Sequence, residues 1–279
     1  MNDNPTQRVV IAGIDGSDPV LAAVDLAAAE ARRRRLPLRL LATAPRADAA
    51  APTDLTAVLR RVSTTWPGLP TSGQTVTGAL AEEVIDASRG AGLVVIGRPD
   101  RRAHHPLGGD EVRIAAHSQC PTVVVPAGAP VIPDAPVLLG VGIVPDDEPA
   151  IGFAFETASL WRVPLLAVHV WSGIPSAAVG KVSPFAYDLH RAQAAADAML
   201  ADQLAGWAEK FPDVRVDRMP LYDVNPAQTL LDASAMAGLV VVGAHRRDLG
   251  GSQLLGTVSR TLVASASRPV AVIHPAYHP

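Results

Sequence analysis

The sequence predicts an α/β protein of two tandem doubly wound domains, each with a parallel sheet in the strand order 3-2-1-4-5. Runs of Val, Ile and Leu alternate with helical patterns, which favours parallel strands joined by right-handed crossovers. These runs are continuous rather than alternating with polar residues, as expected for strands that are covered on both faces. The order of elements in the first half of the chain also returns in the second half.

Each half begins with a strand, a helix and a second strand, and the helix runs into a proline that opens the second strand. In the first half these elements are expected at 9–15, 19–35 and 37–41. In the second half they are expected at 137–143, 149–162 and 164–170, where the acids at 146–148 followed by Pro149 are typical of a helix start. The four arginines at 32–35 are interpreted as charge at a helix C-terminus, in preference to a nucleic-acid contact.

The repeat is clearest near the end of each half. The run at 91–97 returns at 237–243 with only one substitution, and each copy is followed by a polar loop, a helix and a last apolar strand, at 121–125 and 269–273. The second half carries an insertion at about 172–211, which includes a long helical pattern at about 187–210. Four prolines between 126 and 136 favour an extended linker. We therefore expect domains at 1–132 and 133–279.

The last strand of each domain is apolar and would expose unpaired backbone groups at a sheet edge. We predict that residues 122–125 pair antiparallel with residues 270–273. The two domains would then form an intrachain pseudo-dimer, and two such chains could associate further as a homodimer.

Composition narrows the class of protein. The chain is 48% hydrophobic and has a formal net charge of -3, which favours a globular protein and argues against a nucleic-acid partner. No apolar run is long enough to span a membrane, and no signal peptide is recognisable at the N-terminus. Cys120 is the only cysteine, which fits a reducing, cytoplasmic compartment, and we expect it to be a buried, inert thiol.

In doubly wound sheets a ligand binds at the carboxyl ends of the strands, where the strand order reverses. In the second domain, the fourth strand ends at Gly243, and Gly256-Thr257 opens the next helix. We expect Thr257 to be the N-cap, and the free N–H groups of that helix to form a phosphate cradle. Arg246 could add a guanidinium contact to phosphate, or it could lie in a solvated loop. The alternative is that Gly243 only ends a strand and Thr257 only caps a helix.

These residues resemble the universal stress protein family, and the two copies resemble its tandem form, with a fold like that of the adenine nucleotide alpha hydrolases. ATP-binding members of that family carry two spaced glycines, then Gly-Ser or Gly-Thr, an aspartate that ends the first strand, and a valine that contacts adenine. By this resemblance Gly243, Gly256 and Thr257 bind phosphate, and Val170 contacts the base. Arg246 stands at the position of the second glycine, and Gly142 replaces the aspartate.

The first domain retains other parts of the pattern. Asp15 and Gly97 match the family's aspartate and first glycine, so the resemblance assigns them to a weaker nucleotide site. The Gly-Ser or Gly-Thr pair is missing, and Asp110 and Glu111 would lie near the phosphates, where like charges repel. Nucleotide is therefore expected in the second domain.

The sequence contains no recognisable catalytic motif, and we expect neither catalytic residues nor a protein-bound metal. The resemblance implies a non-enzymatic stress-response protein that binds ATP, with magnesium, or another adenine nucleotide. Two alternatives remain open at this stage: a nucleotide-independent interaction or dimerisation module, and a slow ATP hydrolase.

Overall fold

The structure is a computed structural model, and it describes residues 8–14, 20–43, 54–99, 109–130, 132–142, 147–172, 185–244, 246–249 and 252–277. For residues 185–189, 246–249 and 252–254 only the backbone is described. The elements of the N-terminal half are β1 (Val9–Ile14), α1 (Val20–Arg34), β2 (Leu38–Thr43), α2 (Leu55–Thr65), β3 (Thr71–Val76), α3 (Leu80–Ala87), the 3-10 turn Ser88–Gly90, β4 (Ala91–Arg98), α4 (Asp110–His117) and β5 (Thr122–Pro126).

The C-terminal half follows the same order with a longer second helix, and it has a hairpin before its last helix. Its elements are β6 (Val137–Gly140), α5 (Glu148–Trp161), β7 (Leu165–Trp171), α6 (Phe185–Lys210), β8 (Val216–Tyr222), α7 (Pro226–Ala233), the 3-10 turn Ser234–Met236, β9 (Leu239–Gly243), β10 (Arg246–Leu249), β11 (Ser252–Leu255), α8 (Thr257–Ser265) and β12 (Val270–Ile273).

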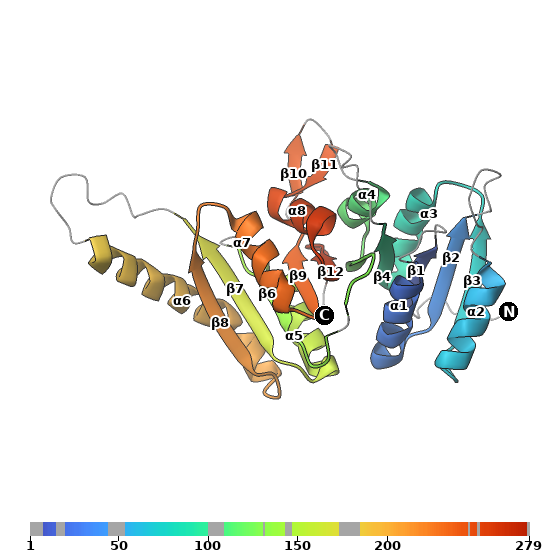
Figure 1. Cartoon of the computed structure of the whole chain (residues 1–279), viewed down its shortest axis with the longest axis horizontal. Coiled ribbons are helices and arrows are strands. Elements are labelled where there is room, and N and C mark those ends of the chain that lie inside the picture. Colours follow the sequence, from blue (N-terminus) through green and yellow to red (C-terminus); the bar gives the residue numbers. More distant parts are fainter. Residues whose placement is uncertain are drawn as a thin grey trace.

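Ten of the described strands form one sheet, in the order β3-β2-β1-β4-β5-β12-β9-β6-β7-β8 (Figure 1). Read from its outer edge toward the centre, each half therefore has the order 3-2-1-4-5 predicted from the sequence, with its first and fourth strands at the switch point. Neighbouring strands are parallel within each half. This confirms the predicted doubly wound α/β fold.

The halves meet where β5 and β12 pair antiparallel. Val124 lies opposite Val270, and Val123 lies opposite Ala271, so the predicted pairing of these last strands is confirmed. All of these side chains are buried, and the pairing removes an open sheet edge from the middle of the molecule.

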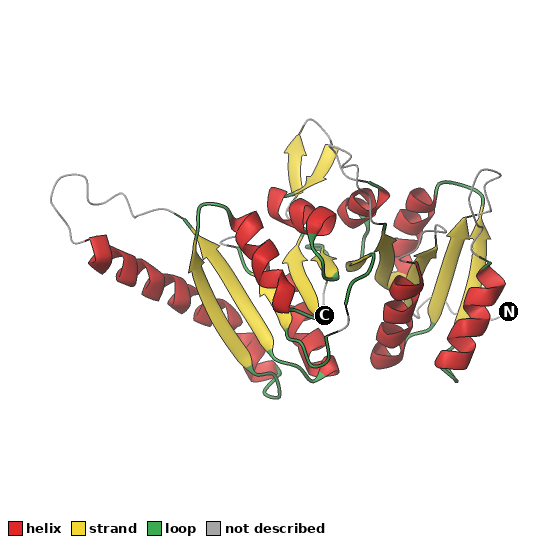
Figure 2. Cartoon of the chain, in the orientation of Figure 1, coloured by secondary structure: helices red, strands yellow, loops and turns green. Residues whose placement is uncertain are grey.

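Two layers of helices cover the sheet (Figure 2). One face packs against α1, α2, α5 and α6, where Phe153, Phe155 and Leu200 are among the largest fully buried side chains. The other face packs against α3, α4, α7 and α8. The continuous apolar strands are explained by this arrangement, because both faces of the sheet are buried.

The segment between β9 and α8 differs from the prediction. The sequence predicts an irregular polar loop there, but the structure forms the antiparallel hairpin β10–β11, in which Leu249 lies opposite Ser252. Two glycines, Gly250-Gly251, stand between these strands in the sequence, and such a pair is a common two-residue hairpin signal. The hairpin packs against α4 of the N-terminal half.

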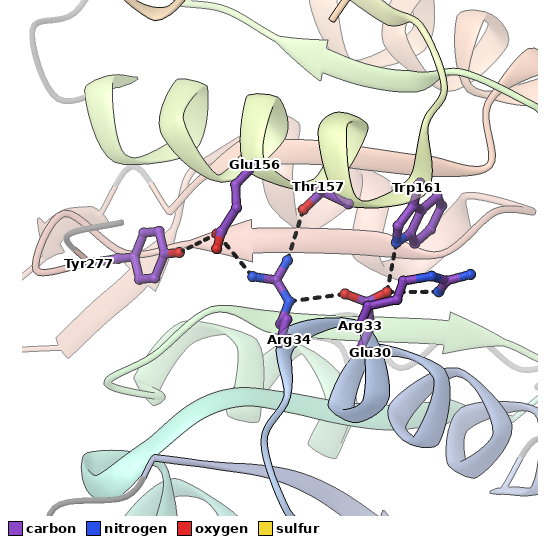
Figure 3. A network of polar contacts seen from close by, with 7 residues as sticks. All are labelled: Glu30, Arg33, Arg34, Glu156, Thr157, Trp161 and Tyr277. Carbon is purple, nitrogen blue, oxygen red and sulfur yellow. Dashed lines mark hydrogen bonds and ion pairs between the residues drawn. The ribbon is translucent and has the colours of Figure 1, made fainter. Parts of the chain in front are cut away.

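A buried polar network joins the two halves on the face covered by α1 and α5 (Figure 3). Glu30 is 3% exposed, and its carboxylate accepts hydrogen bonds from Arg34 Nε at 3.0 Å and from Trp161 Nε1 at 2.7 Å. Arg34 also donates to Glu156 Oε2 at 2.9 Å and to Thr157 Oγ1 at 3.0 Å. The guanidinium of one half is thus enclosed by acceptors from both halves.

Electrostatics favour the charged form of this arginine. Burial alone would lower the pKa of Arg34, but the carboxylates of Glu30 and Glu156 raise it above its ordinary value. Near the C-terminus, Tyr277 donates to Glu156 Oε2 at 3.0 Å. Burial, and then the negative charge of Glu156, raise the pKa of Tyr277, so this phenol remains a donor in neutral solution.

Cys120 provides a test of burial in this sheet. The residue is 5% exposed, and burial raises the pKa of its thiol to about 12. Because only the thiolate is an efficient nucleophile, we expect native protein to react with a disulfide reagent at pH 8 at least 100-fold more slowly than protein unfolded in urea, on the order expected from the thiolate fraction. Rapid native-state labelling, followed by absorbance, would contradict the buried position of Cys120.

Candidate functional site

The candidate site lies in the C-terminal half, where β9 ends and α8 begins. Gly243 is the last residue of β9, a strand that lies between β12 and β6 in the sheet. Ser259, in the first turn of α8, donates from Oγ to the carbonyl of Gly243 at 2.7 Å, and its side chain is buried. The start of α8 is therefore fixed against the carboxyl end of β9.

The N-terminus of α8 presents free backbone donors. Arg260 N–H donates to the carbonyl of Gly256 at 2.9 Å, which is the first bond of the helix, so earlier N–H groups have no acceptor within it. Among the side chains that the structure describes, none caps this end. The arrangement offers backbone N–H groups and the positive end of a helix dipole, which together suit an anion such as phosphate.

The prediction that Thr257 is the N-cap is wrong by one residue. Gly256 is the N-cap, with φ -55° and ψ 153°, and Thr257 is the first residue of the helix. The carbonyl of Gly256 accepts the first hydrogen bond of the helix, from Arg260 N–H. Thr257 is exposed and lies one residue beyond the N-cap position. Glycine is among the residues favoured at the N-cap position.

The structure places Val170 on the same face of the sheet as α8, and the backbone of Arg246 next to the residue that precedes Gly256. Val170 lies in β7 and packs against the apolar cluster that also receives Val258 of α8, so the two lie on the same face of the sheet. Arg246 begins β10, where its backbone pairs with Leu255, and its side chain lies outside the described residues.

The N-terminal half differs at the corresponding place. Gly97 lies in β4, opposite Val125, whereas Asp15 falls outside the described residues. Gly109 is the N-cap of α4, and both Asp110 and Glu111 lie in the first turn. A Cβ built on Gly109 would lie 2.4 Å from Glu111 Oε2, so this carboxylate folds back over the helix N-terminus. The negative charge expected at this helix end is therefore present.

Sequence reasoning missed Asp147. Its side chain is 2% exposed and accepts a hydrogen bond from Gly142 N–H at 2.6 Å, so a carboxylate does lie beside the end of the first strand of this half. The carboxylate comes from the N-cap of α5 rather than from the strand. The acids before Pro149 were a sequence signal for the start of this helix. They could not show that the side chain of Asp147 reaches back to Gly142, because that contact forms only in the folded chain.

Sequence reasoning also did not predict that His169 is buried. Its ring is buried, and Nδ1 lies 2.9 Å from the carbonyl of Val141, to which it donates because a carbonyl can only accept. This bond joins the ends of β6 and β7 next to Val170. Across the part of the chain that the structure describes, no group of three or more His, Cys, Asp or Glu side chains could hold a metal ion.

The fold and site define a doubly wound α/β protein in which the first turn of α8 is tied to the carboxyl end of β9, the edge of the sheet where this class binds ligands. The Universal stress protein family model matches residues 135–274. A universal stress protein of Mycobacterium tuberculosis is 33% identical over 95% of this chain and 97% of its own length. The chain belongs to the universal stress protein family.

Other comparisons agree with this assignment. A universal stress protein of Mycolicibacterium smegmatis is 37% identical over 71% of this chain and 66% of its own. The solved structure of a universal stress protein from Archaeoglobus fulgidus covers 96% of this chain and 97% of that one, with a TM-score of 0.64 at 15% identity, which supports the fold. Other solved universal stress proteins are complexes with cAMP and with dAMP. None of the described helices is both long and apolar enough to cross a membrane.

Proposed function

We propose that this chain is a non-enzymatic universal stress protein that binds ATP, with magnesium, or another adenine nucleotide in its C-terminal domain, residues 133–279. The observation that carries the proposal is the uncapped N-terminus of α8, which is fixed against Gly243 by Ser259. Gly256 and Thr257 would meet the phosphates, Val170 the base, and Arg246 would add a positive charge.

The N-terminal domain, residues 1–132, would act mainly as a structural partner. The acids at the start of α4 oppose a phosphate, so Gly97 and Asp15 would belong to a degenerate site. The paired strands β5 and β12 support an intrachain pseudo-dimer of two related domains. We place the protein in the cytoplasm, in keeping with its single cysteine.

The test is to identify small molecules released from purified, denatured protein by mass spectrometry, and to titrate the native protein with ATP and magnesium. We expect an adenine nucleotide or, if none is retained, saturable binding of ATP. At 100 times its dissociation constant, ATP should stabilise the folded state by about 2.7 kcal/mol. No bound nucleotide and no thermal shift at millimolar ATP would favour the interaction module. Steady release of ADP from bound ATP would make the protein a slow hydrolase.

A further inference from the structure

Helix α8, which carries the candidate site at its N-terminus, is held at its other end by the N-terminal half. Arg98 is the last residue of β4 and directly follows Gly97. Its guanidinium donates from Nη1 to the carbonyl of Ala264 and from Nη2 to the carbonyl of Ala266. Ala264 lies in the last turn of α8, and Ala266 is its C-cap.

The chemistry of this contact suits a helix end. The final carbonyls of a helix have no donors within the helix, and they carry the negative end of its dipole. An arginine provides two N–H groups in a fixed, planar arrangement together with a positive charge. Arg98 thus satisfies acceptors that α8 cannot satisfy itself, and it does so from the other half of the chain.

α8 is consequently fixed at both ends. Ser259 ties its first turn to Gly243 of β9, and Arg98 ties its last turn to β4. The helix has nine residues, so its ends lie only about 13 Å apart at 1.5 Å per residue. A short rigid helix transmits a shift at its C-terminus to the N–H groups at its N-terminus. α4 packs alongside α8 on the same face of the sheet (Figure 1).

The contact is one-sided. Ala244 follows Gly243 in the C-terminal half, just as Arg98 follows Gly97 in the N-terminal half. An alanine side chain has no donor, so that position cannot return the same contact to α4. Arg98 contacts α8, which has no acidic residue in its first turn, whereas the first turn of α4 contains Asp110 and Glu111.

We infer that Arg98 is a positioning residue for the nucleotide site of the C-terminal half, holding α8 so that its first turn meets the phosphates. This inference rests on the proposed function. It adds that the N-terminal domain contributes to binding through the far end of α8, without touching the nucleotide itself.

The test compares native protein with Arg98→Ala for the affinity of ATP and of adenosine, both measured by displacement of a fluorescent ATP analogue. Because α8 would contact only the phosphates, we expect the dissociation constant of ATP to rise about tenfold, which is about 1.4 kcal/mol, and that of adenosine to stay the same. Arg98→Lys keeps the charge but loses the planar pair of donors, so its ATP affinity should fall between the two. The Lys variant also keeps the test decisive if the Ala variant folds poorly.

Arg268→Ala is the matched control. Arg268 likewise donates two N–H groups to backbone carbonyls, those of Pro130 and Ala235, but neither belongs to α8. We expect this variant to lose stability and to keep the native ratio of ATP to adenosine affinity. If native protein binds ATP and Arg98→Ala leaves that ratio unchanged, the positioning role is wrong and the nucleotide site stands. If native protein binds neither ligand, the proposed function fails and the inference falls with it.

Discussion

Replacing Arg34 with alanine is expected to lower the free energy of unfolding by about 3 kcal/mol, the low end of the range for breaking a buried ion pair. The side chain of Glu30 is only 4% exposed, and it would lose its buried charge partner and keep Arg33, which is 40% exposed, while remaining beside Trp161. Glu156 is 33% exposed and can be rehydrated, which is why we expect no larger loss. Urea unfolding followed by circular dichroism measures the change.

Two further variants separate buried charge from lost packing. Arg61→Ala removes an exposed arginine that pairs with Asp25 within the N-terminal half, and it should change stability by less than about 0.5 kcal/mol. Adding Glu30→Gln to Arg34→Ala removes a buried charge that the more exposed Arg33 would otherwise neutralise alone, but keeps an acceptor for Trp161 Nε1, so part of the stability should return. An Arg34→Ala protein as stable as the native one would show that this network does not hold the halves together.

Replacing Gly256 with glutamate is expected to abolish the stabilisation by ATP. A carboxylate at the N-cap of α8 would compete for the free N–H groups and repel the phosphates. A stabilisation of about 2.7 kcal/mol at 100 times the dissociation constant corresponds to several degrees, at about 2–4 °C per kcal/mol for domains of this size. A thermal melt with and without ATP and magnesium measures the shift.

Gly109→Glu is the matched control, because Gly109 is the N-cap of α4 just as Gly256 is the N-cap of α8. The three atoms nearest a Cβ at Gly109 all belong to the carboxylate of Glu111, and that flexible side chain can move away. We expect the ATP shift to persist in this variant. A shift that is lost in Gly109→Glu and kept in Gly256→Glu would place the nucleotide in the N-terminal half.

The strands themselves could be predicted from local signals, and their order and the pairing of β5 with β12 from the class of fold that these strands and the internal repeat indicate. Continuous apolar runs mark buried parallel strands, and an apolar last strand in each half requires a partner. The boundaries of α1 and α5 follow within one residue from the proline and acid patterns around them.

The contacts that join the halves could not be predicted in the same way. Arg34 was interpreted only as part of the basic run at 32–35, and Arg98 was not singled out, because the acceptors that they reach in the other half lie more than 100 residues away in the sequence. The one-residue error at Thr257 has a simpler cause: both glycine and threonine are favoured at the N-cap, so the pair Gly256-Thr257 does not fix the first helical residue. Gly142 marks an absent aspartate in the sequence, but Asp147 brings a carboxylate to it through folding.

Hydrogen–deuterium exchange with and without ATP tests most directly whether nucleotide binds at the start of α8. The N–H groups of Thr257, Val258 and Ser259 have no acceptor within the helix, so they should exchange quickly in the free protein. We predict that ATP and magnesium slow exchange in the peptide containing these residues and leave the first turn of α4, from Asp110, unchanged. Protection at α4 alone, or at neither helix while ATP is bound, would contradict this account.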